Sequence, residues 1–191
     1  MTAIPQVFQE LEPLFTRRLV LRRMSLADTD AIFNHYNNPE IVQYSIGGIH
    51  HDKEQTETYI NSVLNAYENN YGGIWCIFLR NSQTMVGVCG IELWYQDHFR
   101  AEIGYSISRP HWGVGYATEA VEALITFGFT RMKLHRIEAI CHIDNEPSLR
   151  VLEKVGMLYE GTLREHIYSE GVFYTVKLYS ILKLDWETGC S

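Results

Sequence analysis

The sequence contains few residues of the kinds that mark a metalloprotein or a disulfide-stapled protein. Its 191 residues include only four cysteines, which share no C-x-x-C spacing, and its eight histidines show no metal-ligand spacing. A zinc site, another metal centre or a disulfide framework is therefore disfavoured. The cysteines are Cys76, Cys89, Cys141 and Cys190. The first three lie in apolar, strand-like runs, and we expect them to be buried, reduced thiols.

Long apolar runs and excess positive charge are also missing. Nowhere do about 18 apolar residues follow one another, as a membrane-spanning helix requires. Residues 1–15 lack the basic region and apolar run of a signal peptide. The 16 Lys and Arg residues against 23 Asp and Glu give a formal net charge of −7, which disfavours a nucleic-acid partner. We expect a cytoplasmic protein with a cationic substrate, such as an amine or a basic protein tail.

The sequence does contain strand and helix patterns that follow one another without a linker or a repeat. A hydrophobic fraction of 46% is enough for one core, and we expect a single domain at 16–187 after a lead-in at 1–15. Strands are expected at 16–24, 74–79, 85–93, 101–108 and 136–143 and on both sides of a turn at Glu170-Gly171; helices are expected from near 31 and at about 52–69, 115–132 and 145–156. The predicted fold class is α+β (α/β mixed), with a mostly antiparallel twisted sheet of about seven strands, about four flanking helices and one helix-linked crossover.

The segment RPHWGVGYATEA, from Arg109 to Ala120, places two glycines between a strand and an amphipathic helix. Gly113 and Gly115 allow backbone conformations and close approaches that other residues do not. The first turn of the helix presents unpaired N–H groups at the positive end of its dipole, so the segment can cradle a phosphate or pyrophosphate. Two other interpretations stay open on spacing alone. One is a dinucleotide-binding fingerprint, although Thr118 stands where its third glycine belongs, and the other is a plain glycine-rich turn.

The residues WGVGYA, from Trp112 to Ala117, resemble the Q/R-x-x-G-x-G/A acetyl-CoA loop of the GNAT superfamily of N-acetyltransferases. Trp112 stands where the superfamily usually has Gln or Arg, and this form is typical of the RimJ/RimL branch. Three further segments are similar to that branch, in the same order, over roughly residues 16–184 in total. They are TRRLVLRRMSLADTD (Thr16 to Asp30), RAEIGYSI (Arg100 to Ile107) and NEPSLRVLEKVGMLYEGTLRE (Asn145 to Glu165, with Met157 where Phe is usual). The chain is identified as a member of this RimJ/RimL-like branch, which resembles ribosomal-protein N-terminal acetyltransferases.

The resemblance implies a GNAT fold and an acyltransferase that moves an acetyl group from acetyl-CoA directly to a primary amine. The first acceptor it implies is a protein N-terminal α-amine, of the ribosomal-protein type. A small-molecule amine (polyamine, amino sugar, amino acid or antibiotic) and a non-catalytic acyl-CoA-binding role stay open, as do a monomer and a homodimer. The thioester would lie in a V-shaped gap between the 101–108 and 136–143 strands. By the same resemblance, backbone groups of Ile107, Trp112, Gly113, Val114, Gly115, Tyr116 and Ala117 contact the cofactor.

The catalytic assignments rest on the resemblance too. Glu102 matches the glutamate that acts as a base in some superfamily members, and Glu92 on the preceding strand is the second candidate; the alternative is a strand glutamate paired with an arginine. A carboxylate of ordinary pKa is a poor base for an amine, so burial would have to raise its pKa. Ser148 matches the serine proposed to assist the departing thiolate, and Asn145 would cap its helix and hydrogen-bond the pantetheine arm. Asn-x-x-Ser at a helix start is also ordinary capping.

Overall fold

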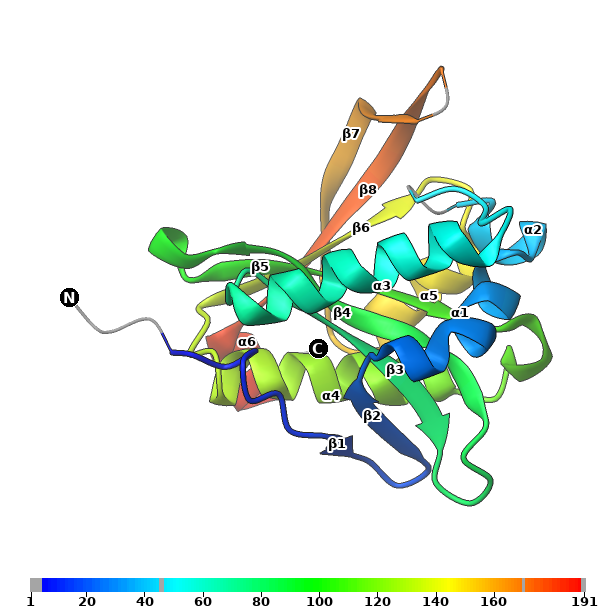
Figure 1. Ribbon diagram of the computed structural model, residues 1–191. Coiled ribbons are helices and arrows are strands. Elements are labelled where there is room, and N and C mark those ends of the chain that lie inside the picture. Colours follow the sequence, from blue (N-terminus) through cyan, green and yellow to red (C-terminus); the bar gives the residue numbers. More distant parts are fainter. Residues whose placement is uncertain (1–4, 45–46, 170, 190–191) are drawn as a thin grey trace.

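The computed structural model of this chain describes residues 5–44, 47–169 and 171–189. Within these ranges it contains an eight-stranded sheet and six α-helices (Figure 1). The strands are β1 (Leu14–Phe15), β2 (Leu19–Arg23), β3 (Gly73–Leu79), β4 (Met85–Tyr95), β5 (Arg100–Ile107), β6 (Arg136–His142), β7 (Leu158–Ser169) and β8 (Val172–Leu182). The helices are α1 (Thr29–Tyr36), α2 (Pro39–Val42), α3 (Lys53–Glu68), α4 (Tyr116–Thr130), α5 (Glu146–Lys154) and α6 (Lys183–Thr188). This confirms the predicted fold class, to which the structure adds the short elements β1, α2 and α6.

The sheet has the strand order β1-β2-β3-β4-β5-β6-β8-β7, and its neighbours pair antiparallel except for β5 and β6. The helix α4 connects these two parallel strands, as the predicted crossover requires. Their ladder joins residues 100–102 to residues 136–138. Beyond that point β5 continues to Ile107 against β4, and β6 continues to His142 against β8. A gap therefore opens between β5 and β6 toward their carboxyl ends.

The helices α2, α3 and α5 begin at capping side chains that the sequence supplies. The side chain of Asp52 accepts a hydrogen bond from the N–H of Gln55 at the start of α3, and Asn69 follows its last turn. Ile60 and Tyr67 of α3 are fully buried. In Figure 1, α1 and α3 lie on one side of the sheet and α4 lies on the other. Hydrophobic side chains are therefore needed on both faces of the central strands, which explains their nearly continuous apolar sequences.

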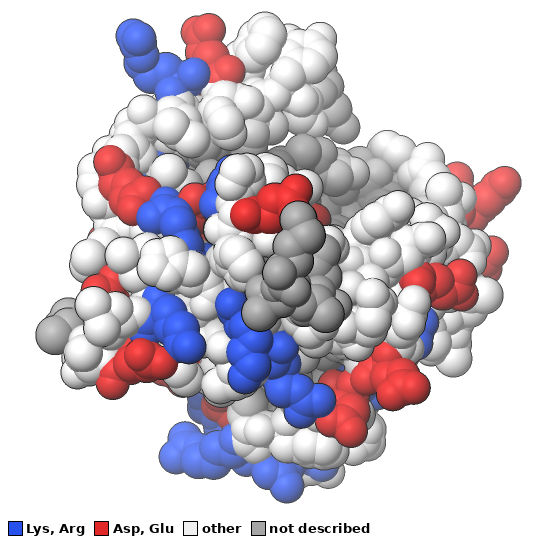
Figure 2. Space-filling model, turned by 90° about the vertical axis from the view of Figure 1, so that its left-hand side faces the viewer, with Lys and Arg blue, Asp and Glu red and all other residues white. Residues whose placement is uncertain are grey.

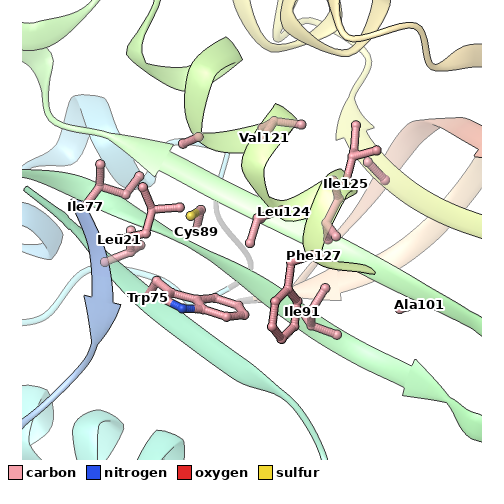
Figure 3. Packing of buried hydrophobic residues seen from close by; sticks show 14 of the residues in the cluster. Leu21, Trp75, Ile77, Cys89, Ile91, Ala101, Val121, Leu124, Ile125 and Phe127 are labelled. Atoms are coloured by element: carbon pink, nitrogen blue, oxygen red, sulfur yellow. The ribbon is translucent and has the colours of Figure 1, made fainter. Parts of the chain in front are cut away.

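The core between α4 and the sheet is rich in aromatic side chains. Figure 3 shows Leu124 and Phe127 of α4 pointing toward the strands, beside Ile91 of β4. The ring of Phe127 meets Trp75 of β3 edge-on, with 5.1 Å between ring centroids. Phe8, from the segment before the first strand, is fully buried here, and its ring centroid lies 6.2 Å from that of Trp75. The N-terminal residues thus take part in the core of the domain.

The three cysteines that the structure describes, Cys76, Cys89 and Cys141, are buried free thiols, as expected, and burial raises the pKa of each. Cys190 lies outside the described residues.

In the described part of the chain, no helix is long and apolar enough to cross a membrane. Nor do the described residues include a group of three or more His, Cys, Asp or Glu side chains that could hold a metal ion. On the face seen in Figure 2, basic and acidic side chains are interspersed.

Candidate active site

The glycine-rich segment forms the turn between β5 and α4. Gly113 and Gly115 have φ angles of +76° and +86°, in the left-handed region that favours glycine. A Cβ at Gly113 would meet nothing within 4 Å, so glycine is favoured here by its backbone conformation and not by a lack of space for a side chain. Gly115 is the N-cap of α4, and no side chain caps the helix. The N–H groups of the first turn of α4 are therefore open to an anionic ligand.

Trp112 ties this loop to the end of β5. Its indole Nε1 donates a hydrogen bond to the carbonyl oxygen of Ile107 at 2.5 Å. The guanidinium of Arg109 lies over the indole ring, 4.5 Å from its centroid, and its Nε donates to Glu40 of α2 at 2.8 Å. The tryptophan that distinguishes this loop thus has a structural role, because it fixes the loop relative to the strand that feeds it. The charge of Arg109 is already paired.

Side chains from both sides of the β5–β6 gap meet at Ser148, in the first turn of α5. Its hydroxyl lies 2.7 Å from the hydroxyl of Tyr105 on β5, which also donates to the Ser148 carbonyl at 3.1 Å. Burial raises the pKa of the Cys141 thiol on β6, and the nearby Ser148 side chain partly offsets that rise. The helix cap itself is made by Asn145, whose Oδ1 accepts from the N–H of Ser148 at 3.3 Å. Capping therefore uses the backbone of Ser148 and leaves its hydroxyl available to the gap.

Glu92 occupies a β-bulge in β4. Ile91 pairs with Ile103 and Leu93 pairs with Glu102, so Glu92 is the extra residue, and a bulge of this kind redirects a side chain. Its carboxylate lies over Gly104 of β5, where a Cβ would come within 1.8 Å of Oε1. Glu92 is an exposed residue, and it borders a recess lined by α3 and residues 72–74. Burial, and then repulsion from Glu102, raises the pKa of Glu92 to about 7.

Glu102 has a different environment, at the closed end of the gap. It pairs in register with Glu138 of β6, and burial and then the charge of Glu138 raise its pKa, against the opposing effects of His166 and Arg100. Arg100 does not pair with Glu102: its Nη1 donates to Glu138 at 2.5 Å, and Arg136 donates to the other Glu138 oxygen at 2.6 Å. Among the described residues the predicted alternative, a Glu102–arginine ion pair, is not formed.

Aromatic residues of α1 and α3 pack together and are electrostatically coupled to Glu92. The hydroxyls of Tyr36 and Tyr59 lie 3.4 Å apart, and the Tyr36 ring also packs against His50, with 4.8 Å between centroids. Burial raises the pKa of Tyr59 to about 12 and that of Tyr36 well above its usual value, and the charge of Glu92 adds to both shifts. Two neutral phenols therefore lie near the Glu92 carboxylate.

Comparison with known proteins identifies the family to which this chain belongs. Residues 18–158 match the family described as the acetyltransferase (GNAT) domain. The chain belongs to the GNAT acetyltransferase family. The GNAT chain is 34% identical to the uncharacterized N-acetyltransferase p20 of Bacillus licheniformis, over 92% of this chain and 99% of that protein. It is 36% identical to the uncharacterized N-acetyltransferase YoaA of Bacillus subtilis (strain 168), over 89% and 96% of the two chains. A more distant relative, 26% identical over 75% of both chains, is the ribosomal-protein-serine acetyltransferase of Escherichia coli (strain K12).

Solved structures of acetyltransferases have a similar fold. A GNAT-family acetyltransferase from Bacillus anthracis has a TM-score of 0.80 and 29% identity, and covers 90% of this chain and 98% of its own. RimL, a ribosomal L7/L12 α-N-protein acetyltransferase solved with coenzyme A, has a TM-score of 0.79 at 21% identity, with 90% and 98% coverage, and shows the likeness of fold. The sequence-based identification is thereby confirmed: this GNAT protein is an acyltransferase of a family that uses acetyl-CoA.

The structure of this GNAT domain arranges the predicted residues in three groups. The loop residues form the turn before the uncapped start of α4, Asn145 and Ser148 lie beside the gap, and Glu102 and Glu92 lie on the face covered by α1 and α3. Tyr105 was not predicted, although it lies in the RAEIGYSI segment. Its contact with Ser148 depends on how β5 and β6 diverge, and only the alternation of the strand could have hinted at it.

Proposed function

We propose that this GNAT enzyme transfers an acetyl group from acetyl-CoA directly to the N-terminal α-amine of a protein, with Glu92 as the general base. The observation that carries the proposal is the β-bulge that turns the Glu92 carboxylate over Gly104 at the edge of a recess, where its pKa is raised to about 7. Catalysis by a base is most effective when its pKa lies near the operating pH. An α-amine, with a pKa of about 8, matches that base far better than a lysine at about 10.4.

The residues at the loop and the gap fit the donor. The left-handed glycines and the uncapped start of α4 suit a diphosphate, and the gap between β5 and β6 suits an extended pantetheine arm. The backbone groups from Trp112 to Ala117, with Ile107, would hold these parts, and Asn145 would hydrogen-bond the arm. Acetyl-CoA supplies an activated thioester to this site.

Each residue then has a defined task. Glu92 accepts a proton from the attacking amine, and the neighbouring charge of Glu102 keeps the pKa of Glu92 high, which reverses the order of the two candidates from the sequence. Backbone N–H groups of β5 that face β6 have no β6 partner beyond Glu102 in the described structure, so they can donate to the carbonyl oxygen as it gains charge. The Ser148 hydroxyl, held by Tyr105, is placed to hydrogen-bond the departing sulfur.

The formal net charge of −7 and the names of two relatives support a protein N-terminal amine as the acceptor. Two electrostatically coupled carboxylates, Glu92 and Glu102, favour a cationic acceptor. The E. coli relative is named as a ribosomal-protein-serine acetyltransferase, and RimL as an α-N-protein acetyltransferase, and both names support a protein N-terminus as the acceptor.

A panel of acceptors tests the proposal. Free CoA thiol is measured after mixing the enzyme and acetyl-CoA with peptides that have a free N-terminus, with the same peptides blocked at the α-amine but containing lysine, and with polyamines and amino sugars. We expect release with the free N-termini only. Release with polyamines or amino sugars alone would show a small-molecule enzyme, and CoA binding without release from any amine would show an acyl-CoA-binding protein.

A further inference from the structure

Arg18, just before β2, reaches across the fold to the cofactor loop. Its Nη1 donates to the carbonyl oxygen of Val114 at 2.9 Å, although the two residues are 96 positions apart in sequence. Its guanidinium carbon lies 4.7 Å from the centroid of the Tyr116 ring. A Cβ at Gly115 would lie 3.3 Å from its Nη2. One guanidinium therefore contacts Val114 and Tyr116 and lies beside Gly115 between them.

The other edge of Arg18 binds Glu119, in the first turn of α4. Nε donates to Glu119 Oε2 at 2.6 Å, and the Arg18 backbone N–H donates to Oε1 at 2.7 Å. The Thr16 hydroxyl donates to the same Oε1 at 2.6 Å. The Glu119 side chain is 13% exposed. Burial would raise the pKa of Glu119, but the hydrogen bonds from Thr16 and Arg18 outweigh it, so this pKa is lowered and the carboxylate stays charged.

Glu119 lies where its negative charge would weaken the binding of an anion, and the positive charge of Arg18 offsets it. Glu119 lies within the first turn of the helix whose N–H groups form the anion cradle. An unpaired carboxylate there would repel a diphosphate, because like charges a few ångströms apart interact strongly near a protein surface. A guanidinium that binds Glu119 cancels that repulsion. Its bond to the Val114 carbonyl also fixes the direction of the next N–H, that of Gly115, because the peptide unit is planar and trans.

We propose that Arg18 is a positioning residue for coenzyme A: it holds the Val114–Gly115 peptide in its anion-binding orientation and neutralises Glu119 behind the cradle. The proposal rests on the proposed function only in that the loop binds the diphosphate of the donor. Arg18 acts through the loop and through Glu119, so it affects the binding of acetyl-CoA and not the chemistry at the amine.

The test compares two acetyl donors. Arg18→Gln should raise the KM for acetyl-CoA, and the Kd for CoA, about tenfold, because it removes charge-assisted hydrogen bonds, while kcat at saturation stays within about twofold. With S-acetyl-N-acetylcysteamine, a thioester without a diphosphate, the same substitution should leave kcat/KM unchanged. Arg17→Gln is the matched control, since the neighbouring Arg17 is exposed and makes the same change of charge.

Further variants separate the two tasks of Arg18. The double variant Arg18→Gln with Glu119→Gln also removes the carboxylate, and it should restore part of the CoA affinity. Arg18→Lys keeps the positive charge but loses the forked set of guanidinium donors, so it should give an intermediate Kd for CoA. It also tests the inference if Arg18→Gln does not fold. A folded Arg18→Gln with the Kd of Arg17→Gln, or an equal loss with the short donor, would overturn the inference. If the wild-type protein did not bind CoA, the donor site itself would be wrong.

Discussion

Glu92 and Glu102 lie on adjacent strands but have different surroundings, and those surroundings decide which one suits proton transfer. Glu92 leaves the ladder at a bulge and lies over Gly104, whereas Glu102 stays in the ladder beside the ion-paired Glu138. The family resemblance put Glu102 first, with Glu92 on the preceding strand as the second candidate. The sequence could not show the bulge at Glu92, since a bulge depends on how two strands pair and not on the residues of one strand.

Substitutions of the two glutamates distinguish their roles through the pH profile. For the wild-type enzyme, kcat/KM should rise with pH through about 7, because Glu92 must be deprotonated to accept a proton and its pKa is about 7. Glu92→Gln should lower kcat/KM by roughly two orders of magnitude and remove that rise. Glu102→Gln should keep activity but move the rise to lower pH, since removing a like charge lowers the pKa of Glu92. A wild-type profile in Glu92→Gln, with activity lost in Glu102→Gln, would make Glu102 the base.

The position of Ser148 leads to a second prediction about a single residue. Ser148→Ala should lower kcat by roughly one to two orders of magnitude, because it removes the hydroxyl that we propose as a hydrogen-bond partner of the departing sulfur. The melting temperature should change little, since Asn145 caps α5 through the Ser148 backbone N–H. Asn145→Ala is the converse control and should cost about 1 kcal/mol of stability. A wild-type kcat in Ser148→Ala would leave Ser148 as a part of the helix start only.

The loop before α4 was predictable as an element because its glycines are a local signal. Helix, strand and cap residues were predictable for the same reason: α3 runs between Asp52 and Asn69, both of which read as capping residues. The short helix α2 and the Arg18–Val114 contact were not predictable. The first is too short to show a period, and the second joins residues 96 positions apart. The gap between β5 and β6 could be expected only from the family resemblance.

The conformation of this loop predicts a graded response at Gly115. Gly115→Ala should weaken CoA binding modestly, because φ is +86° and the new Cβ would lie 3.3 Å from Arg18. Gly115→Glu should abolish detectable binding, since it adds a side chain and a negative charge at the helix N-terminus that receives the diphosphate. Calorimetric titration with CoA, on protein with an unchanged circular dichroism spectrum, measures both. Equal affinity in wild type and Gly115→Glu would contradict the assignment of the loop.

At the scale of the whole molecule, one core links the N-terminal segment to the face that supports the active site. Phe8 packs among Trp75, Trp94 and Phe127, and is fully buried. Phe127 belongs to α4, whose first turn forms the cradle. The sequence indicated only a short lead-in here, because a single phenylalanine in a polar segment carries no periodic signal.

This packing predicts a large effect of one substitution far from the chemistry. Phe8→Ala should lower the free energy of unfolding by about 3–5 kcal/mol, as for other buried aromatic truncations. Phe15→Ala is the control, since Phe15 is 69% exposed and should change stability by less than about 0.5 kcal/mol. Urea unfolding of both variants measures the difference. Equal stabilities would show that residues before β1 do not support the core.

The central claim, direct transfer from a loop-bound donor to an amine in the Glu92 recess, is tested most directly by intact-mass spectrometry of enzyme and products. The enzyme is incubated with acetyl-CoA alone and then with a peptide that has a free N-terminus. We predict an unmodified enzyme mass at every stage, and one acetylated peptide for each CoA thiol released. An enzyme that gains an acetyl group before the peptide is added, or thiol release without acetylated peptide, would contradict it.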